Sequence, residues 1–350
     1  MDKTKAITYI ESSFLSPLFK DSNITDISYN GEGIYYLSNI KGRSKSNIVI
    51  THGVAKDFIR QIANFTERQF SFTNPTLDIS VGKYRIHAEH QSIGRYKEEE
   101  TVTFVIRIAS EKIRISPHSD FLTPEISSLI QVLISNRLSI VIGGLPSTGK
   151  TEFQKYLLFQ FPKYERVIVV DNVSELDYTR NDEIDLTYWK SDEDNENASN
   201  KKLIRSALRS NPDWLILAEA RGKEMVDVLQ SAMTGLPLIT TLHALDAEAM
   251  PFRMARMVMQ SEEKNFYQEV LTDIYYHFHF YFYLSRKEKN GLVKRYISQI
   301  NFIDNNGKQY PIFLRSKEKL IFKKLPKEAL KILDVEEADN LFKQTFLEDK

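Results

Sequence analysis

The chain has 350 residues, 42% of them apolar, and its 47 lysines and arginines balance 47 acidic residues; this predicts two domains and gives no sign of a nucleic-acid or acidic partner. Cysteine is absent, which excludes disulfides and cysteine-ligated zinc. Because no apolar segment reaches the roughly 18 residues of a membrane span and the first residues lack the apolar core of a signal peptide, we expect a cytosolic protein whose membrane contact is at most peripheral.

Residues 1–112 predict a small α+β domain. Apolar residues at helical spacing indicate helices within residues 7–18 and 55–63. Alternating apolar and polar residues indicate short strands at residues 24–29, 34–37, 77–81, 84–89 and 101–108. Asn30-Gly31 tolerates positive φ, so we expect a hairpin or short meander between the first two strands.

Two of these strands carry an arginine, Arg85 and Arg107. The ordinary interpretation of each is an exposed arginine at a strand edge. The alternative is an arginine that reaches a phosphate group from another domain or subunit, because a guanidinium group can bind phosphate with two parallel hydrogen bonds. The residues alone leave both interpretations open.

Residues 113–123, where proline and serine gather, predict a linker. Strands and helices then alternate over residues 124–305, which predicts a mostly parallel, covered sheet. Its buried strands are expected at residues 138–142, 166–170, 214–218 and 238–242. Residues 306–350 predict a C-terminal tail or appendage with a helix at its end.

The segment between the first of these strands and the next helix has the pattern of a phosphate-binding loop. It reads Gly144, Leu145, Pro146, Ser147, Thr148, Gly149, Lys150, Thr151. Loop N–H groups and a helix N-terminus favour an anion there, Lys150 adds a positive charge for the β- and γ-phosphates, and the Thr151 hydroxyl can ligate Mg²⁺. Pro146 has no N–H to contribute. The alternative is an ordinary glycine turn before a helix.

Acidic residues and a histidine follow three of the other buried strands: Asp171 and Glu175, Glu219, and His243. Because the carboxyl ends of parallel strands meet at one edge of a sheet, we expect these side chains near the loop. Glu219 is positioned to hold Mg²⁺ through water or to polarise an attacking water. Capping or solvation of a loop is the alternative for the first two acids, and a structural role for the histidine.

An aromatic segment, residues 274–284, is predicted as a core strand paired with residues 293–303. His277 and His279 would share one face of that strand. A metal pair is conceivable, but no third ligand is evident nearby, so we expect no metal there.

The loop, Asp171 to Glu175, Leu208 to Arg221, and Thr234 to His243 occur in one order along the chain. This order resembles the type II/type IV secretion ATPase superfamily of secretion, pilus-assembly and conjugation systems. Residues 207–222 look like its atypical Walker B segment, residues 232–244 like its His box and residues 171–175 like its Asp box. The predicted strands around Arg85 and Arg107 resemble the N-terminal domain of the conjugation and tight-adherence pilus branch.

The resemblance implies a RecA-like P-loop NTPase domain that binds ATP and Mg²⁺ and hydrolyses ATP. By this resemblance, the ATP phosphates would bind at Gly144, Gly149, Lys150 and Thr151. Glu219 and Glu175 would bind Mg²⁺ and activate the attacking water, and the γ-phosphate would be contacted by His243, Arg85 and Arg107. Arg221 and Arg209 would be local or inter-subunit partners. It also implies a homohexamer in which closure of the two domains drives pilus assembly, secretion or conjugative DNA transfer. The partners would be inner-membrane platform or channel proteins, at the cytoplasmic face of the membrane and without direct sequence-specific nucleic-acid binding.

Five residues depart from the family pattern: Asn172 at the second acidic position, Ser147 and Thr148 where glycine and then serine are common, Leu236 where histidine is common and Ala218 in place of a glycine. Two alternative functions stay open. One is a nucleic-acid translocase or helicase; the other is a scaffold that binds ATP without hydrolysing it.

Overall fold

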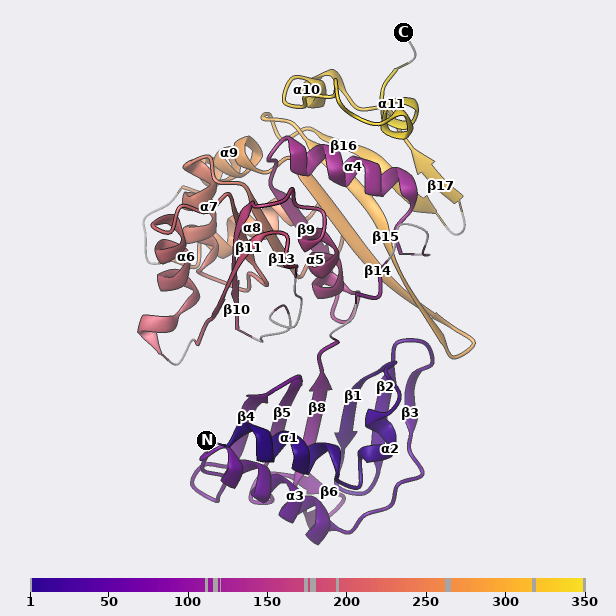
Figure 1. Cartoon of the computed structure of the whole chain (residues 1–350), viewed down its shortest axis with the longest axis vertical. Coiled ribbons are helices and arrows are strands. Elements are labelled where there is room, and N and C mark those ends of the chain that lie inside the picture. The colour runs from indigo at the N-terminus through magenta and orange to yellow at the C-terminus, as the bar shows by residue number, and fades with distance from the viewer. Residues whose placement is uncertain are drawn as a thin grey trace. The chain divides into compact units, whose positions relative to one another are not determined.

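The computed structural model describes residues 2–110, 113–115, 119, 121–172, 176, 181–192, 195–261, 266–316 and 319–348. The chain forms two compact units. Unit 1 comprises Met1–Glu111 with Glu288–Val293, and unit 2 comprises Lys112–Lys287 with Lys294–Lys350. Figure 1 shows the helices and strands of both units. No helix of the described residues is both long and apolar enough to cross a membrane.

Unit 1 is built on a six-stranded antiparallel sheet with the strand order β3-β2-β1-β8-β5-β4. The strands are β1 (Ile24–Tyr29), β2 (Ile34–Ser38), β3 (Gly42–Lys45), β4 (Thr76–Val81), β5 (Tyr84–Glu89) and β8 (Thr103–Ile108). The short strands β6 (Arg95–Tyr96) and β7 (Glu99–Glu100) pair with each other. The helices are α1 (Lys3–Glu11), α2 (Ser16–Phe19) and α3 (His52–Phe65).

Side chains of α1 and α3 pack against one face of this sheet. Phe58 and Ile59 of α3 are buried with Ile86 and Ile106, which alternate along their strands with exposed or partly exposed residues. The single helix predicted within residues 7–18 is wrong, because α1 ends at Glu11 and α2 begins at Ser16. The Ser13 hydroxyl donates to Ile10 O and accepts from Leu15 N, so it supplies hydrogen bonds that a continuing helix would have made.

Unit 2 is built on a nine-stranded sheet in the order β11-β10-β12-β13-β9-β14-β15-β16-β17. The strands are β9 (Ile140–Gly144), β10 (Arg166–Asp171), β11 (Asp185–Lys190), β12 (Trp214–Leu217), β13 (Leu238–Leu242), β14 (Phe280–Lys289), β15 (Leu292–Ile303), β16 (Gln309–Ser316) and β17 (Lys319–Phe322). Neighbours from β11 to β14 are parallel, whereas β15–β16 and β16–β17 are antiparallel. The prediction of a mixed α/β fold with a mostly parallel sheet is confirmed.

Both faces of the parallel strands are buried, which explains their uninterrupted apolar sequences. In β9, Ile140 and Ile142 belong to one core cluster, whereas Val141 between them belongs to the other. The first cluster includes α4 (Pro124–Ser135), α5 (Lys150–Leu158), α10 (Lys327–Leu330) and α11 (Asn340–Phe346). The second includes α6 (Asn200–Leu208), α7 (Met225–Met233), α8 (Met250–Val258) and α9 (Tyr267–His277), and η1 (Glu196–Ala198) precedes α6.

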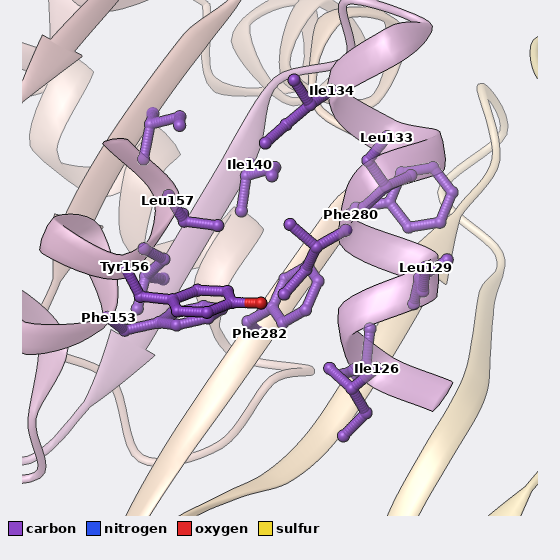
Figure 2. Packing of buried hydrophobic residues seen from close by; sticks show 14 of the residues in the cluster. Ile126, Leu129, Leu133, Ile134, Ile140, Phe153, Tyr156, Leu157, Phe280 and Phe282 are labelled. Carbon is purple, nitrogen blue, oxygen red and sulfur yellow. The ribbon is translucent and has the colours of Figure 1, made fainter. Parts of the chain in front are cut away.

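The first cluster anchors the helix that follows the predicted phosphate-binding loop. Figure 2 shows Phe153 and Leu157 of α5 beside Ile140 and the β14 residues Phe280 and Phe282. Each of these side chains is fully buried, and burial of one contributes about 1.5–3 kcal/mol. The start of α5 is therefore held against β9 by a packed core.

The structure corrects one strand prediction and adds elements that the sequence analysis lacked. Residues 274–277 are the end of α9, and the strand begins at Phe280, so His277 and His279 do not share a strand face. β14 and β15 are neighbours, as predicted. β16 and β17, within residues 306–350, extend the sheet, and β11 forms its other edge. Within the predicted linker, Phe121 and Leu122 are buried in the first cluster.

Candidate nucleotide-binding site

The loop between β9 and α5 turns sharply at three residues. Gly144 has a φ of 156°, Ser147 of 62° and Gly149 of 98°. Gly149 is the N-cap of α5 in the left-handed conformation, which glycine adopts without steric cost. The buried Thr148 hydroxyl donates to Leu145 O at 2.8 Å and closes the loop on itself. Residues 145–147 are exposed, so the backbone of this turn is open to a ligand.

Lys150, the first residue of α5, points back into the loop. Its ammonium lies 3.0 Å from Gly144 O, 3.2 Å from Leu145 O and 3.2 Å from His243 Nδ1. The residue is only 9% exposed. Burial lowers the pKa of Lys150 to about 8; Glu219 opposes that shift and Arg221 adds to it. The ammonium is thus placed where an anion bound by the loop would meet a poorly solvated positive charge.

His243 and Glu219 continue this chain of contacts across the strand ends. His243 Nε2 lies 2.8 Å from Glu219 Oε1. Arg221 donates to Glu219 Oε2 from Nε at 2.9 Å and from Nη2 at 2.7 Å. Lys150, His243, Glu219 and Arg221 therefore form one connected polar network, although they come from the start of α5 and from the segments after β12 and β13.

The contacts of His243 favour one arrangement of its ring proton. With the proton on Nε2, the ring donates to Glu219 and Nδ1 accepts from Lys150. With a proton on Nδ1, the ring would donate to Gly144 O at 3.1 Å but would face the Lys150 ammonium donor to donor. The Nε2–H form is the one that satisfies both charged neighbours, so this histidine connects the lysine to the glutamate.

The sheet register brings these residues together. Thr240 in β13 pairs with Val141 in β9 and with Leu217 in β12, so the ends of the three strands are aligned. The Thr241 hydroxyl donates to Ala218 O at 2.7 Å and fixes the segment that leads to Glu219. Ends of parallel strands that lie side by side are where ligands bind in such sheets.

The donor set of this site suits magnesium. Thr151 follows Lys150 in α5 and offers a hydroxyl, and Glu219 offers a carboxylate. Mg²⁺ prefers oxygen ligands and is commonly held by one or two protein oxygens together with phosphates and water. Both oxygens of Glu219 already accept hydrogen bonds from His243 and Arg221, which favours contact with the metal through water.

Arg85 and Arg107 lie in unit 1, whereas the loop lies in unit 2. They are directly opposite each other on β5 and β8, and both strands are internal to the sheet, so the interpretation as strand-edge residues is wrong. Each is paired with an acid on a neighbouring strand: Arg85 Nε lies 3.5 Å from Asp78 Oδ1, and Arg107 Nε lies 3.3 Å from Asp26 Oδ1. Two adjacent guanidinium groups therefore share one partly exposed face of the sheet.

Other predicted candidates are not part of this network. Glu175 lies outside the described residues. Asp171 is 2% exposed, and its Oδ2 accepts from Tyr188 OH at 2.7 Å, so it bonds to β11. His279 Nδ1 lies 2.9 Å from Ile303 O. Among the described residues no group of three or more metal-binding side chains comes together. Burial lowers the pKa of His279, as expected of a structural histidine.

A comparison with known families shows to which of them the chain is similar. The family model described as "Type II/IV secretion system protein" matches residues 97–272, half of the chain. The chain belongs to the type II/IV secretion system protein family. The matched residues contain β9, the loop, β12 and β13, and hence the whole network from Lys150 to Arg221.

Several known proteins are similar to the chain over most of its length. An uncharacterized protein of Bacillus anthracis is 30% identical over 279 residues, which are 77% of this chain and 61% of that protein. The type IV secretion system protein VirB11 of Bartonella henselae is 23% identical over 75% of this chain and 83% of its own length. The crystal structure of the ATPase DotB of Yersinia pseudotuberculosis has the same fold, with a TM-score of 0.63 at 14% identity over 84% of this chain and 79% of DotB.

Two side chains that bond near the loop were not predicted from the sequence. Arg295 Nε in β15 donates to Ser147 O at 2.8 Å, and Gln154 Nε2 in α5 donates to Leu217 O at 3.2 Å. Gln154 follows Lys150 by one helical turn, a spacing that could have indicated it. Arg295 lies 148 residues beyond Ser147 and beyond the residues that the family model matches, so no local signal pointed to it.

Proposed function

We propose that this chain binds MgATP at the loop between β9 and α5 and hydrolyses it. The observation that supports this most strongly is the hydrogen-bonded series from Lys150 through His243 to Glu219. These residues come from three segments that are distant in sequence. An ordinary glycine turn before a helix would not require a histidine and a carboxylate from two other strand ends to meet its lysine.

Binding of the phosphates falls to the loop and to the start of α5. Backbone N–H groups of the loop and the helix N-terminus attract the phosphate oxygens, and the Lys150 ammonium adds a charge-assisted hydrogen bond. Thr151 and Glu219 would hold Mg²⁺, which would supply positive charge to offset that of the phosphates. The exposed turn at residues 145–147 leaves room for the nucleotide to approach.

Hydrolysis requires that water be held in line with the γ-phosphate. Glu219 is the residue for this role, with Glu175 as its predicted partner, and His243 contacts the γ-phosphate. Arg221 makes two hydrogen bonds to one oxygen of Glu219, so it limits the orientations of that carboxylate. Positioning and electrostatic stabilisation supply most of the rate enhancement in phosphoryl transfer.

We further propose that unit 2 is a RecA-like domain and that Arg85 and Arg107 of unit 1 close on the γ-phosphate. Guanidinium groups that arrive with domain closure would stabilise the charge that develops in the transition state. Their ion pairs with Asp26 and Asp78 are partly exposed, and such pairs contribute about 0–1 kcal/mol. Exchange of these partners for a phosphate is therefore inexpensive.

The proposed cellular role is that of a motor in a type II or type IV secretion system, a pilus or a conjugation system. VirB11 of Bartonella henselae is described as a type IV secretion system protein and DotB as an ATPase, and both support this role. Six copies would form a ring at the cytoplasmic face of the membrane. The ring would act on inner-membrane platform or channel proteins.

The test is release of phosphate from MgATP by wild-type protein and by Glu219→Gln. We expect turnover by the wild type and a loss of about 100-fold or more in Glu219→Gln, with nucleotide affinity retained, because the substitution removes the charge but keeps the shape of the side chain. Glu196→Gln, an equal change at an exposed residue of η1, should leave turnover unchanged. Turnover that Glu219→Gln does not alter would contradict the assignment.

The same assay separates the two alternative functions. A strong, salt-sensitive stimulation of turnover by DNA would favour a translocase or helicase. Nucleotide binding without turnover, in wild type and Glu219→Gln alike, would favour a scaffold gated by ATP.

A further inference from the structure

The conformation of Ser147 raises a question that the proposed nucleotide site does not answer. Ser147 has a φ of 62°, in the left-handed region that costs an L-residue roughly 1–2 kcal/mol. It lies in the middle of the exposed turn, where its own side chain packs against no core. Such a conformation persists only if surrounding contacts hold it.

One contact that holds it comes from the strand after the family-matched residues. Arg295 Nε donates to Ser147 O at 2.8 Å, a length typical of a strong hydrogen bond from a charged donor. The carbonyl of a residue turns with its backbone dihedral angles, so fixing this oxygen fixes the peptide plane between Ser147 and Thr148 and with it the direction of the Thr148 N–H. That N–H is one of the groups from which a phosphate cradle would be built.

The stem of the arginine also lies beside the N-cap of α5. A Cβ placed on Gly149 would come within 3.6 Å of Arg295 Cδ and 3.1 Å of a ring carbon of Phe121. Arg295 and Phe121 therefore both lie beside Gly149, and Arg295 also contacts Ser147. A side chain larger than hydrogen at Gly149 would press against the Phe121 ring and would be in ordinary contact with Arg295.

Arg295 is itself held in place by core packing. Ile297, two residues further along β15, is fully buried, and its N–H donates to Phe121 O at 3.3 Å. Phe121 packs against Phe153 of α5, with ring centroids 5.9 Å apart. The strand that carries Arg295 is thus hydrogen-bonded to Phe121, and Phe121 packs against the helix that follows the loop.

We propose that Arg295 is a positioning residue of the phosphate loop, which holds Ser147 in the left-handed conformation and so sets the affinity for nucleoside diphosphates and triphosphates. The proposal rests on the proposed function for its ligand, but the clamp on Ser147 is a property of the protein alone. Glycine adopts the left-handed conformation unaided. We therefore expect nucleotide affinity to depend on Arg295 when residue 147 is serine, and not when it is glycine.

The test combines Arg295→Gln and Arg295→Lys with Ser147→Gly. Two quantities are measured: hydrogen exchange of backbone amides in residues 143–150 without nucleotide, and the dissociation constant of a fluorescent ADP with Mg²⁺. We expect Arg295→Gln to raise exchange of the loop and to weaken ADP binding, each about tenfold, the size expected for one hydrogen bond from a charged donor. Arg295→Lys, which keeps the charge but lacks the Nε donor, should recover only part of the affinity.

The decisive comparison is the same substitution in the Ser147→Gly protein. There, Arg295→Gln should weaken ADP binding by no more than about twofold, because the glycine no longer needs the clamp. Arg315→Gln is the matched control: this arginine lies over the Tyr296 ring and should alter neither quantity. Thermal unfolding of each variant verifies that it is folded. If Arg295→Gln does not fold, Arg295→Lys takes its place in the comparison.

Two results would overturn the proposal. One is loop exchange and ADP affinity that Arg295→Gln leaves unchanged; the other is an equal loss of affinity in the serine and glycine proteins, which would mean that Arg295 acts through charge alone. If wild-type protein does not bind ADP, the proposed function fails, while the exchange measurement still decides whether Arg295 holds the loop.

Discussion

The two units of this chain carry their charged residues in contrasting ways. In unit 2, Lys150, His243 and Glu219 lie at the start of a helix and just beyond strand ends, where they bond to one another and where the lysine is almost fully buried. In unit 1, Arg85 and Arg107 lie within antiparallel strands, on a partly exposed face, and each bonds to an acid of its own sheet.

The difference follows from the two kinds of sheet. A parallel sheet with helices on both faces offers polar side chains only at its strand ends, so charges gather there into one network. An antiparallel sheet with one covered face places every second side chain in solvent, and charges there are neutralised by neighbours across the strands. We therefore propose that unit 2 holds a binding site of its own, and that the arginines of unit 1 act only on a ligand that is brought to them. This comparison gives different predictions for substitutions in the two units.

The largest effect is expected on turnover when the unit 1 arginines are changed. Arg85→Gln or Arg107→Gln should lower ATP turnover by roughly 10³-fold, the scale of an arginine that stabilises the phosphoryl-transfer transition state. The dissociation constant for ADP should change by less than about twofold, because the binding network lies in unit 2. Arg43→Gln, at an exposed arginine of β3, is the control. Equal loss of binding and turnover would remove the distinction between the units.

Lys150→Ala should have the opposite signature. Loss of a poorly solvated ammonium from the loop should weaken ADP binding by about 10- to 100-fold, since a charged hydrogen bond contributes about 1.5–3 kcal/mol. Isothermal titration with MgADP measures the effect. Lys163→Ala, an exposed lysine paired with Glu183, should bind ADP as the wild type does. Undiminished affinity in Lys150→Ala would show that the nucleotide binds elsewhere.

The pH dependence of binding sharpens this point. The pKa of Lys150 is lowered to about 8, chiefly by burial, so the charged fraction of this lysine falls as pH rises through 8. ADP affinity should therefore drop about tenfold between pH 7 and pH 9. In Lys150→Arg, whose guanidinium stays charged over this range, affinity should be lower but independent of pH. A wild-type affinity that is flat from pH 7 to pH 9 would contradict the burial of a functional lysine.

The smallest effect contrasts two buried tyrosines. Tyr281 in unit 2 is fully buried, and its hydroxyl has no hydrogen-bond partner among the described residues, whereas Tyr29 in unit 1 donates to Gly31 O at 2.8 Å. Tyr281→Phe should raise stability by about 1 kcal/mol, because an unpaired buried hydroxyl is removed. Tyr29→Phe should lower it by a similar amount. Differential scanning calorimetry compares the two, and a destabilising Tyr281→Phe would indicate a hydrogen bond in solution.

The sequence predicts those elements that are encoded by residues close together in the chain. The loop from Gly144 to Thr151 has a characteristic pattern of residue types. Glu219 and His243 each follow a short apolar segment that is typical of a buried strand. The mostly parallel sheet followed from the alternation of strands and helices. Arg85 and Arg107 were recognised as strand residues, but sequence alone did not place them on internal strands and opposite each other.

The features that sequence reasoning missed depend on tertiary contacts. Arg295 and Gln154 donate hydrogen bonds to backbone carbonyl groups. Every residue has such a group, so the sequence of the partner segment does not indicate the contact. The aromatic residues 274–284 fit a buried helix as well as a strand, because such short apolar segments lack a decisive period, and so the end of α9 was misassigned. In β16, Pro311 pairs with Asn301 beside a register shift of the ladder, a position that tolerates proline.

The central claim is that a nucleotide bound at the loop of unit 2 draws in the arginines of unit 1. Hydrogen exchange of the full chain with and without a non-hydrolysable MgATP analogue tests it most directly. The account predicts slower exchange in residues 143–151, 218–222 and 240–244 of unit 2 and, in the same sample, around Arg85 and Arg107. Protection that stops at unit 2 would contradict the role of the arginines, and no protection at the loop would contradict the site itself.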